Sequence, residues 1–154
     1  MAKQGRFEEA ASQFAKAIQI NPRLAEAHNN LGKALLSSGQ PGQRGQVAEA
    51  EKEFETAISL NPQYADAQNN LGVLYGQEGN DAEAERLFRE AIKNDAEFAA
   101  ALVNLGAVLA SESRFAEADA VVLKALQIEP GNKEAQDLRT MIKAQGTEPG
   151  KAVE

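Results

Sequence analysis

One pattern recurs three times along this sequence, in segments that start at Ala25, Ala65 and Ala99. The second and third segments start 34 residues apart, whereas the first and second start 40 residues apart. A period of this length is typical of helical repeat proteins, in which each unit buries its apolar face only against its neighbours. The repetition therefore restricts the fold to a stack of similar units.

Each half of a repeat is predicted to form an amphipathic helix of about a dozen residues. In the middle repeat, the apolar positions of each half share one helical face: Ala67, Leu71, Leu74 and Tyr75, then Ala84, Leu87, Phe88, Ala91 and Ile92. Asn80 and Glu83 have the spacing of a capping box, which predicts the start of the second helix. Pro22, Pro62 and Pro130 are expected to mark helix ends, because proline cannot continue a helix.

The six extra residues of the first repeat fall within residues 39–46, which contain Gly39, Pro41, Gly42 and Gly45. This composition predicts a loop between two helical halves, and a long loop costs little free energy. The glycine spacing is similar to that of a phosphate-binding loop, but the segment lacks the Lys-Ser/Thr ending and follows no strand. We interpret residues 39–46 as a loop insertion without a ligand.

The repeats resemble the tetratricopeptide repeat (TPR) family, whose 34-residue helix–turn–helix unit has Leu-Gly, then Tyr, then Ala-x-x-x-Phe, then Pro. The middle repeat supplies Leu71, Gly72, Tyr75, Ala84 and Phe88 at these positions. The other two repeats match through Leu31, Gly32, Leu35, Ala50, Phe54, Ala57 and Pro62, and through Leu105, Gly106, Leu109, Ala118, Val122, Ala125 and Pro130. The resemblance implies an all-α fold, a right-handed α-solenoid (TPR superhelix) of antiparallel helix pairs.

Departures from the family pattern concern two positions. The family's bulky residue four places into each repeat is His28 and Gln68 in the first two repeats, and only Leu102 fills the position well. Ala96 stands where proline is usual. Both departures are expected to weaken local packing or turn geometry, and His28 is expected to be a packed or half-buried side chain.

The resemblance divides the chain into a single TPR domain, residues 1–144, and a flexible tail, residues 145–154. Within the domain we expect the second helix of a half-repeat at 6–22, repeat 1 at 25–62 with its loop insertion at 39–46, repeat 2 at 65–98, repeat 3 at 99–132 and a capping helix at 133–144. The half-repeat has no first helix before Met1, which favours a fragment of a longer TPR array. Phe7, Phe14 and Ile18 would then be partly uncovered, and weak self-association through the N-terminal helix is expected.

Asparagine and glycine, both poor helix formers, recur together in Asn-Asn-Leu-Gly at 29–32 and 69–72 and in Val-Asn-Leu-Gly at 103–106. We expect the glycine to let a neighbouring helix approach closely. In the family, first helices line the concave surface, so the resemblance implies a ladder of Asn30, Asn70 and Asn104 along that groove. A row of carboxamides can bind an extended peptide main chain. Spacing alone leaves open a second role, in which they bond only to neighbouring repeats.

Other side chains at helical spacing are predicted to line the same groove, which changes from polar to apolar along its length. With the three ladder residues, the predicted peptide- or partner-binding set is completed by Glu26, Asn29, Lys33, Asp66, Asn69, Val73, Gln77, Val103 and Ala107. Family members that bind chaperone tails clamp two carboxylates with Lys, Arg and Asn. Ala100 and Asn104 stand where the third repeat should supply Lys and Arg, so a chaperone tail is not the expected ligand.

The expected function is non-catalytic binding of a peptide or partner protein in the concave groove. Two alternatives stay open: a substrate-docking or regulatory TPR region of a larger enzyme, such as a glycosyltransferase, and a structural scaffold that self-assembles. The glutamates of the second helices are expected to face solvent beside Lys and Arg, namely Glu8, Glu9, Glu49, Glu51, Glu53, Glu83 and Glu85.

Composition excludes several other classes of function. The 154-residue chain has a net charge of −7 and no basic stripe, so nucleic acid and an anionic membrane surface are not expected partners. With no cysteine and one histidine, no metal site, cofactor or catalytic set is expected, and the chain is not expected to be an enzyme. No apolar run approaches the roughly 18 residues that span a bilayer. With no signal peptide visible either, a cytoplasmic location is favoured.

Overall fold

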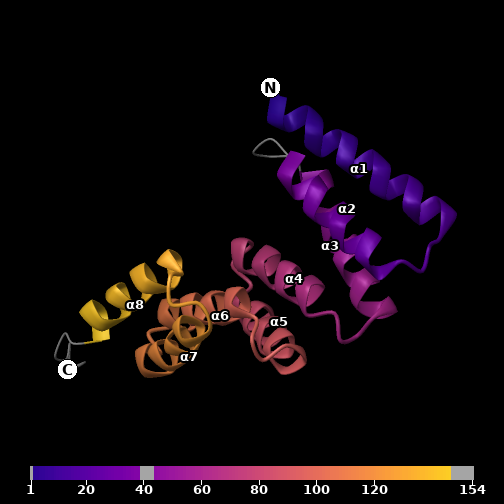
Figure 1. Cartoon of the computed structure of the whole chain (residues 1–154). Helices are drawn as coiled ribbons and strands as arrows, with labels where there is room; N and C mark the ends of the chain where they lie inside the picture. Colours follow the sequence, from indigo (N-terminus) through magenta and orange to yellow (C-terminus); the bar gives the residue numbers. More distant parts are fainter. Residues whose placement is uncertain (1, 39–43, 147–154) are drawn as a thin grey trace.

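The computed structural model describes residues 2–38 and 44–146, which form eight α-helices and no strand. Figure 1 shows them in chain order. Their bounds are α1 Ala2–Ile20, α2 Ala25–Ser38, α3 Arg44–Leu60, α4 Ala65–Gln77, α5 Asp81–Asn94, α6 Ala99–Ser111, α7 Phe115–Ile128 and α8 Lys133–Gly146. The predicted all-α fold is confirmed.

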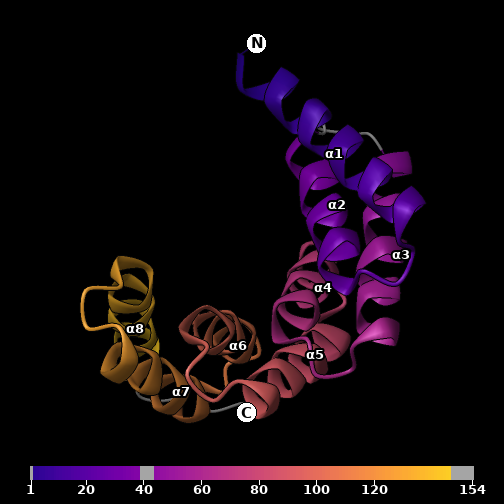
Figure 2. The same ribbon diagram turned by 45° about the vertical axis from the view of Figure 1, so that its right-hand side comes forward.

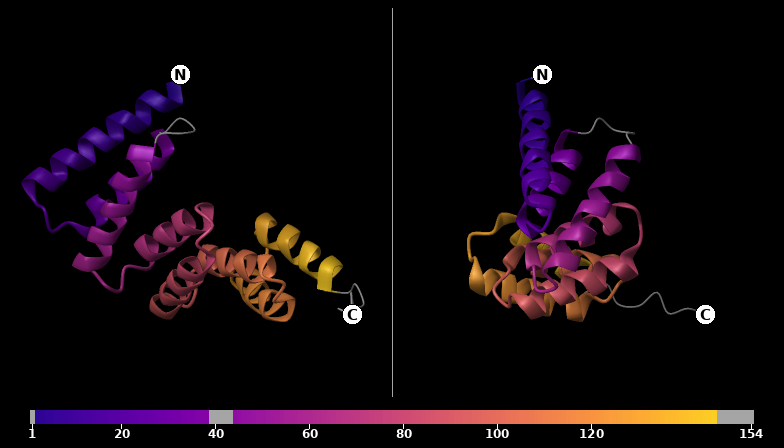
Figure 3. Two further views of the ribbon diagram at one scale, coloured as in Figure 1. Left: turned by 180° about the vertical axis from the view of Figure 1, so that it is seen from behind. Right: turned by 90° about the vertical axis from the view of Figure 1, so that its right-hand side faces the viewer.

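Successive helices pack as antiparallel pairs, and the pairs stack into an arc. The backbones of α2, α4, α6 and α8 each approach the next member of that series, whereas those of α1, α3, α5 and α7 do not approach one another in the described part of the chain. In Figure 2 the first series lies on the inner, concave side and the second on the outer side. Figure 3 shows α1 and α8 at opposite ends of the stack. The predicted helical repeat solenoid is confirmed.

A polar side chain shapes each turn between repeats. Asn21 and Asn61 each accept a hydrogen bond from the backbone N–H two residues on, at 3.1 Å, and Asp95 does so at 3.0 Å. This Asx turn directs the chain into the next helix. It persists beside Ala96, so the missing proline does not remove the turn.

The insertion in the first repeat is shorter than predicted. α3 begins at Arg44, so residues 44–46, which we expected in the loop, belong to the helix. Each residue added to an existing helix contributes a hydrogen bond, and Gly45 costs only about 1 kcal/mol there. The remaining predicted loop residues, 39–43, lie outside the described residues.

Three further local predictions need correction. α1 begins at Ala2 instead of residue 6, and α8 runs to Gly146, so residues 145–146 of the predicted tail are helical. The rest of that tail, residues 147–154, lies outside the described residues. Asn80 occupies the position before α5, but its side chain makes no capping hydrogen bond, so the predicted capping box is wrong.

Glycine allows the two helices of a repeat to pack closely. A Cβ atom on Gly32 would lie 2.7 Å from Cε1 of Phe54, and one on Gly72 would lie 2.7 Å from Cε1 of Phe88. Both rings are buried. The expectation of a close helix approach is confirmed, and the approaching helix is the second helix of the same repeat.

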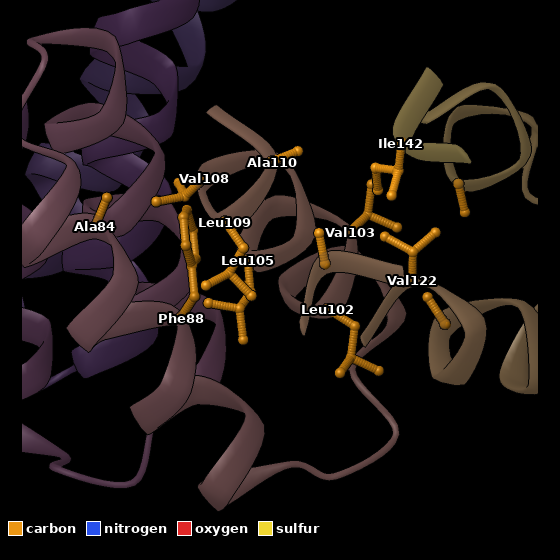
Figure 4. Close-up of a cluster of buried hydrophobic side chains, with 13 residues drawn as sticks. Ala84, Phe88, Leu102, Val103, Leu105, Val108, Leu109, Ala110, Val122 and Ile142 are labelled. Atoms are coloured by element: carbon orange, nitrogen blue, oxygen red, sulfur yellow. The ribbon is translucent and has the colours of Figure 1, made fainter. Parts of the chain in front are cut away.

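The core continues from one repeat to the next. Figure 4 shows one cluster in which Phe88 of α5, Leu105 of α6, Val122 of α7 and Ile142 of α8 take part. Because this cluster spans four helices, the C-terminal repeats are held as one body, and the positions of their inner side chains are fixed by packing.

Candidate functional site

We use the name inner face for a set of exposed and half-buried side chains on α2, α4, α6 and α8, at the groove positions of the repeat. Its members are Glu26, Asn30, Lys33, Asp66, Asn70, Val73, Gln77, Asn104, Ala107, Leu138 and Met141. We call the side chains at one position of the repeat a row. Because the repeats are in register, each first helix contributes one side chain to each row. The row of Asn30, Asn70 and Asn104 continues at Leu138, which lies 34 residues after Asn104.

Asparagine pairs join successive first helices. Nδ2 of Asn70 donates to Oδ1 of Asn29 at 2.8 Å, and Nδ2 of Asn104 donates to Oδ1 of Asn69 at 2.9 Å. Nδ2 of Asn29 donates in turn to the Tyr64 hydroxyl at 3.3 Å. Asn29 and Asn69 are only 2% and 7% exposed. Leaving such a buried acceptor without its donor costs about 1–3 kcal/mol, so the pairs hold the layers in register.

The prediction that Asn29 and Asn69 line the groove is wrong for their side chains. They are rotated from Asn30 and Asn70 by one helical step of about 100°, which turns them toward the following first helix. Asn30, Asn70 and Asn104 are half-buried, so part of each carboxamide stays accessible. Asn70 and Asn104 therefore take part in the inter-repeat bonding that the sequence left open.

The bonded carboxamides retain hydrogen-bonding capacity. A carboxamide has two N–H groups and an oxygen that accepts two hydrogen bonds. Asn70 and Asn104 each use one N–H in the inter-layer bond, and their Oδ1 atoms accept no hydrogen bond from residues 2–38 or 44–146. Each of these two carboxamides therefore keeps one N–H and its oxygen without a partner among the described residues.

The remaining predicted groove residues differ in exposure. The exposed ones are Glu26, Lys33, Asp66, Gln77 and Ala107, while Val73 is half-buried. Val103 is 3% exposed and belongs to the core. Figure 4 shows Val103 beside Ile142, where α6 meets α8.

A pocket of about 550 Å³ opens between α6 and α8, lined by Val103, Ala107, Lys133, Glu134, Asp137, Leu138 and Met141. The sequence prediction included Val103 and Ala107 but missed the residues of α8, which we had treated only as a cap. Continuing the 34-residue register would have found them, because Leu138 and Met141 follow Asn104 and Ala107 by one period.

Family models match most of the sequence. A model described as "TPR repeat" matches residues 2–39, and one described as "Tetratricopeptide repeat" matches residues 42–96 and 75–133. The chain belongs to the tetratricopeptide repeat family. No curated protein matches this TPR chain in sequence.

Solved structures share the TPR fold at low sequence identity. TTC0263, a thermophilic TPR protein of Thermus thermophilus, is 23% identical with a TM-score of 0.75, covering 94% of this chain and 75% of that one. The Arabidopsis OM64 TPR domain is 24% identical with a TM-score of 0.70, covering 78% of this chain and 94% of its own. The first TPR of Spaghetti (RPAP3), bound to the HSP90 peptide SRMEEVD, is 20% identical with a TM-score of 0.70, covering 78% and 90%. At these identities the likeness shows the fold alone.

His28 has a structural role in this TPR protein, as expected of a packed side chain. Its Nδ1 lies 2.6 Å from Oε2 of Glu53, and its Nε2 lies 2.9 Å from the Pro22 carbonyl oxygen. Gln68, at the same position of the next repeat, donates to the Pro62 carbonyl at 2.9 Å. A polar residue at this position therefore hydrogen-bonds to the turn before its own helix, where the family pattern would place a bulky apolar side chain.

Glu51, Glu53 and Glu85 are half-buried and bond to residues outside their own helices, so the expectation that they face solvent is wrong for these three. Glu8, Glu9 and Glu49 are exposed, as expected. The Tyr75 hydroxyl donates to Oε1 of Glu51 at 2.9 Å, and Nη1 of Arg114 donates to Oε2 of Glu85 at 2.8 Å. The hydrogen bond from Arg114 lowers the pKa of Glu85. Burial, with the Glu51 carboxylate second, raises the pKa of Tyr75 to about 12. These carboxylates are used in holding helices together.

Within the described ranges, no group of three or more His, Cys, Asp and Glu side chains is placed to hold a metal ion. No helix of residues 2–38 and 44–146 combines the length and hydropathy of a membrane span. The inner face offers polar groups in regular rows, since one side chain of each first helix occupies each row.

Proposed function

We propose that this TPR protein is an interaction module whose inner face binds a peptide segment of a partner protein. The observation that carries the proposal is the row of half-buried carboxamides, two of which are held by bonds to the preceding layer and keep an N–H and an oxygen without a partner among the described side chains. The structure of the Spaghetti TPR with a bound HSP90 peptide supports peptide binding by the same fold.

The inter-layer bonds favour binding because they fix the carboxamides before a ligand arrives. Asn70 and Asn104 cannot rotate freely without breaking their bonds to Asn29 and Asn69. Less side-chain entropy is then lost when a peptide binds, which raises affinity without an added contact. Bonds to main-chain N–H and C=O groups would tolerate many side chains, so the carboxamide row sets position more than specificity.

We infer further that the module is non-catalytic. Its one histidine has both ring nitrogens engaged, by Glu53 and by the Pro22 carbonyl, so His28 is not free to act as a base on the inner face. The carboxylates with lowered pKa are each hydrogen-bonded to an arginine: Glu85 and Glu117 to Arg114, and Asp119 to Arg139.

The test uses peptides that are selected from a random display library by binding to the 154-residue chain and are then synthesised. Ala107→Arg places a long charged side chain on the inner face, and Ala120→Arg makes the same change at an exposed position of α7 on the outer side. We expect Ala107→Arg to weaken binding about tenfold or more, since the added charge must be desolvated, and Ala120→Arg to leave binding unchanged. Equal binding by both variants, or no selected peptide that binds in solution, would overturn the proposal.

Asn30→Ala tests the carboxamide row itself. The Asn30 side chain makes no hydrogen bond to another described residue, unlike those of Asn70 and Asn104, so its loss removes a ligand contact without breaking a bond between layers. We expect weaker peptide binding with a urea midpoint that is not lowered, because alanine is the better helix former. Unchanged peptide affinity would restrict the asparagines to the structural role.

A second candidate function is self-association of two copies through α1. It is favoured by the exposure of Phe7, Ile20 and Leu24, which are 38%, 86% and 40% exposed at the N-terminal end of the stack. Sedimentation velocity at several concentrations tests it, with Phe7→Ser as the variant that should lower the association. A chain that sediments as a monomer at every concentration would exclude this candidate.

A further inference from the structure

The pocket between α6 and α8 differs in chemistry from the rest of the inner face. In two earlier layers, the equivalent positions hold the asparagine pairs Asn29–Asn70 and Asn69–Asn104. In the α6–α8 layer, the same two positions hold Val103 and Leu138, and both line the pocket. An apolar surface therefore replaces a hydrogen-bonded pair at this end of the inner face.

The pocket is apolar where it is lined by Val103, Ala107, Leu138 and Met141. Met141 is 41% exposed, which is high for a side chain of its kind and leaves apolar surface in contact with water. Burying a leucine-sized side chain against such a surface is favourable, because apolar area is removed from water. The pocket is open, so an occupant gains only part of this.

Acidic side chains border the apolar surface. Glu134 and Asp137 both line the pocket, against one cation, Lys133. Glu134 lies in the first turn of α8, where a carboxylate also complements the helix dipole. Asp137 lies one turn further on, where the dipole effect has fallen off. The row that contains Glu134 also holds Glu26 and Asp66, but the uncharged Ala100 separates these two from Glu134.

We propose that the α6–α8 pocket binds an apolar side chain of a partner peptide in which that residue is flanked by arginine or lysine. This rests on the proposed function, because the same inner face must hold the peptide main chain. The cationic neighbours would pair with Glu134 and Asp137 while the apolar side chain contacts Leu138 and Met141. The net charge of −7 adds a general attraction for a cationic segment.

The acidic border also disfavours acidic ligands. Ala100 and Asn104 of α6 are both uncharged, so neither could pair with a ligand carboxylate. Glu134 of α8, which follows Ala100 by one 34-residue period, is acidic. A peptide such as SRMEEVD, the ligand of the Spaghetti structure, would bring its carboxylates toward Glu134 and Asp137. Like charges brought together across an interface cost binding free energy. This chain is therefore expected to prefer a cationic peptide over an acidic one such as SRMEEVD.

The experiment titrates the ¹⁵N-labelled 154-residue chain with three terminally blocked peptides that differ only in their three central residues: Arg-Leu-Arg, Arg-Ala-Arg and Glu-Leu-Glu. We expect Arg-Leu-Arg to bind about tenfold more tightly than Arg-Ala-Arg, because alanine makes less apolar contact than leucine. We also expect it to bind about tenfold more tightly than Glu-Leu-Glu, because the glutamates would be repelled by Glu134 and Asp137. The largest amide shifts are expected at Ala107, Leu138 and Met141. Equal binding of the three peptides would overturn the proposal.

Two double variants separate local charge from net charge. Glu134→Gln with Asp137→Asn is expected to weaken Arg-Leu-Arg binding about threefold and to reduce its salt dependence, as exposed pairs do. Glu49→Gln with Glu97→Gln makes the same change in net charge at exposed positions away from the pocket, and it should leave binding unchanged. Equal effects of the two double variants would mean that net charge alone attracts the peptide.

The outcomes distinguish this inference from the proposed function. If library-selected peptides bind the inner face but the Arg-Leu-Arg peptide does not, the preference is wrong and the interaction module stands. If neither binds the inner face, both proposals fail. If the free chain forms a dimer that Met141→Gln abolishes, the pocket is occupied by a second copy, which also overturns the inference.

Discussion

Replacing Gly72 by alanine is expected to destabilise the protein, although alanine is the better helix former. The added Cβ would lie 2.7 Å from Cε1 and 3.0 Å from Cδ1 of Phe88, whereas carbon atoms prefer about 3.5–4.0 Å. The ring is 2% exposed and has little room to move. Overpacking of this kind costs about 1–3 kcal/mol, and alanine regains about 1 kcal/mol of helix propensity. The net loss should be about 0–2 kcal/mol.

Gly76→Ala is the matched control on the same helix. Its Cβ would have only Ala84 Cβ nearby, at 3.8 Å, which is an ordinary contact. This variant should therefore gain about 1 kcal/mol of helix propensity without a clash. Because both substitutions gain the same propensity, the difference between them isolates the overpacking cost of about 1–3 kcal/mol at Gly72.

Urea unfolding followed by far-UV circular dichroism measures this difference. Equal stability of Gly72→Ala and Gly76→Ala would refute the reasoning, since the close approach of Phe88 would then carry no cost. A Phe88→Leu background gives a second check. The smaller side chain relieves the clash, so the cost of Gly72→Ala should shrink there, as a double-mutant cycle would show.

Three other predictions concern hydrogen bonds between helices. Asn104→Ala should lower the free energy of unfolding by about 1–3 kcal/mol in the urea assay, because the buried Oδ1 of Asn69 loses its donor. The double change Asn104→Leu with Asn69→Val should cost less than this single change, because no buried acceptor is left unpaired. The pKa of Tyr75 is raised from 10.0 to about 12, so the free energy of unfolding should fall as pH rises between these values, where only the unfolded chain releases the proton; urea midpoints should show a smaller fall for Tyr75→Phe. The hydrogen bond from Arg139 lowers the pKa of Asp119, so the stability that this pair contributes should be lost as pH drops below about 4; Arg139→Gln should reduce the change in urea midpoint between about pH 6 and pH 3.

The helices and their stacking could be predicted because the apolar period and the 34-residue repeat are both explicit in the sequence. Leu71 and Phe88 recur at fixed offsets, so their burial follows once the helix is assumed. The pairing of Gly72 with an aromatic ring of the second helix was also within reach, because the family pattern contains both residues.

The roles of the asparagines could not be predicted, because they depend on the rotation of each helix against its neighbour. Asn29 and Asn30 are adjacent in sequence, but one step around the helix separates a buried acceptor from a half-buried position on the inner face. Nothing in the spacing decides which of the two faces the following layer. Glu51 was misplaced for a similar reason, since its partner Tyr75 lies on another helix.

The α6–α8 pocket was missed because α8 was treated only as a cap for the stack. A capping helix is expected to cover apolar surface, and Ala135 and Ile142 do so. The same helix also continues the rows of the inner face through Leu138 and Met141, which leaves an open pocket beside Ala107. Assigning α8 as the first helix of a further unit would have extended the predicted groove.

Paramagnetic broadening by a peptide that carries a nitroxide most directly tests whether the concave side is the binding surface. The protein has no cysteine, so the label can be confined to the peptide, and its effect reports distance from each backbone amide. Binding on the inner face predicts that amides of α2, α4, α6 and α8 lose intensity while those on the outer sides of α3, α5 and α7 do not. Loss of intensity centred on the outer helices would contradict the proposed function.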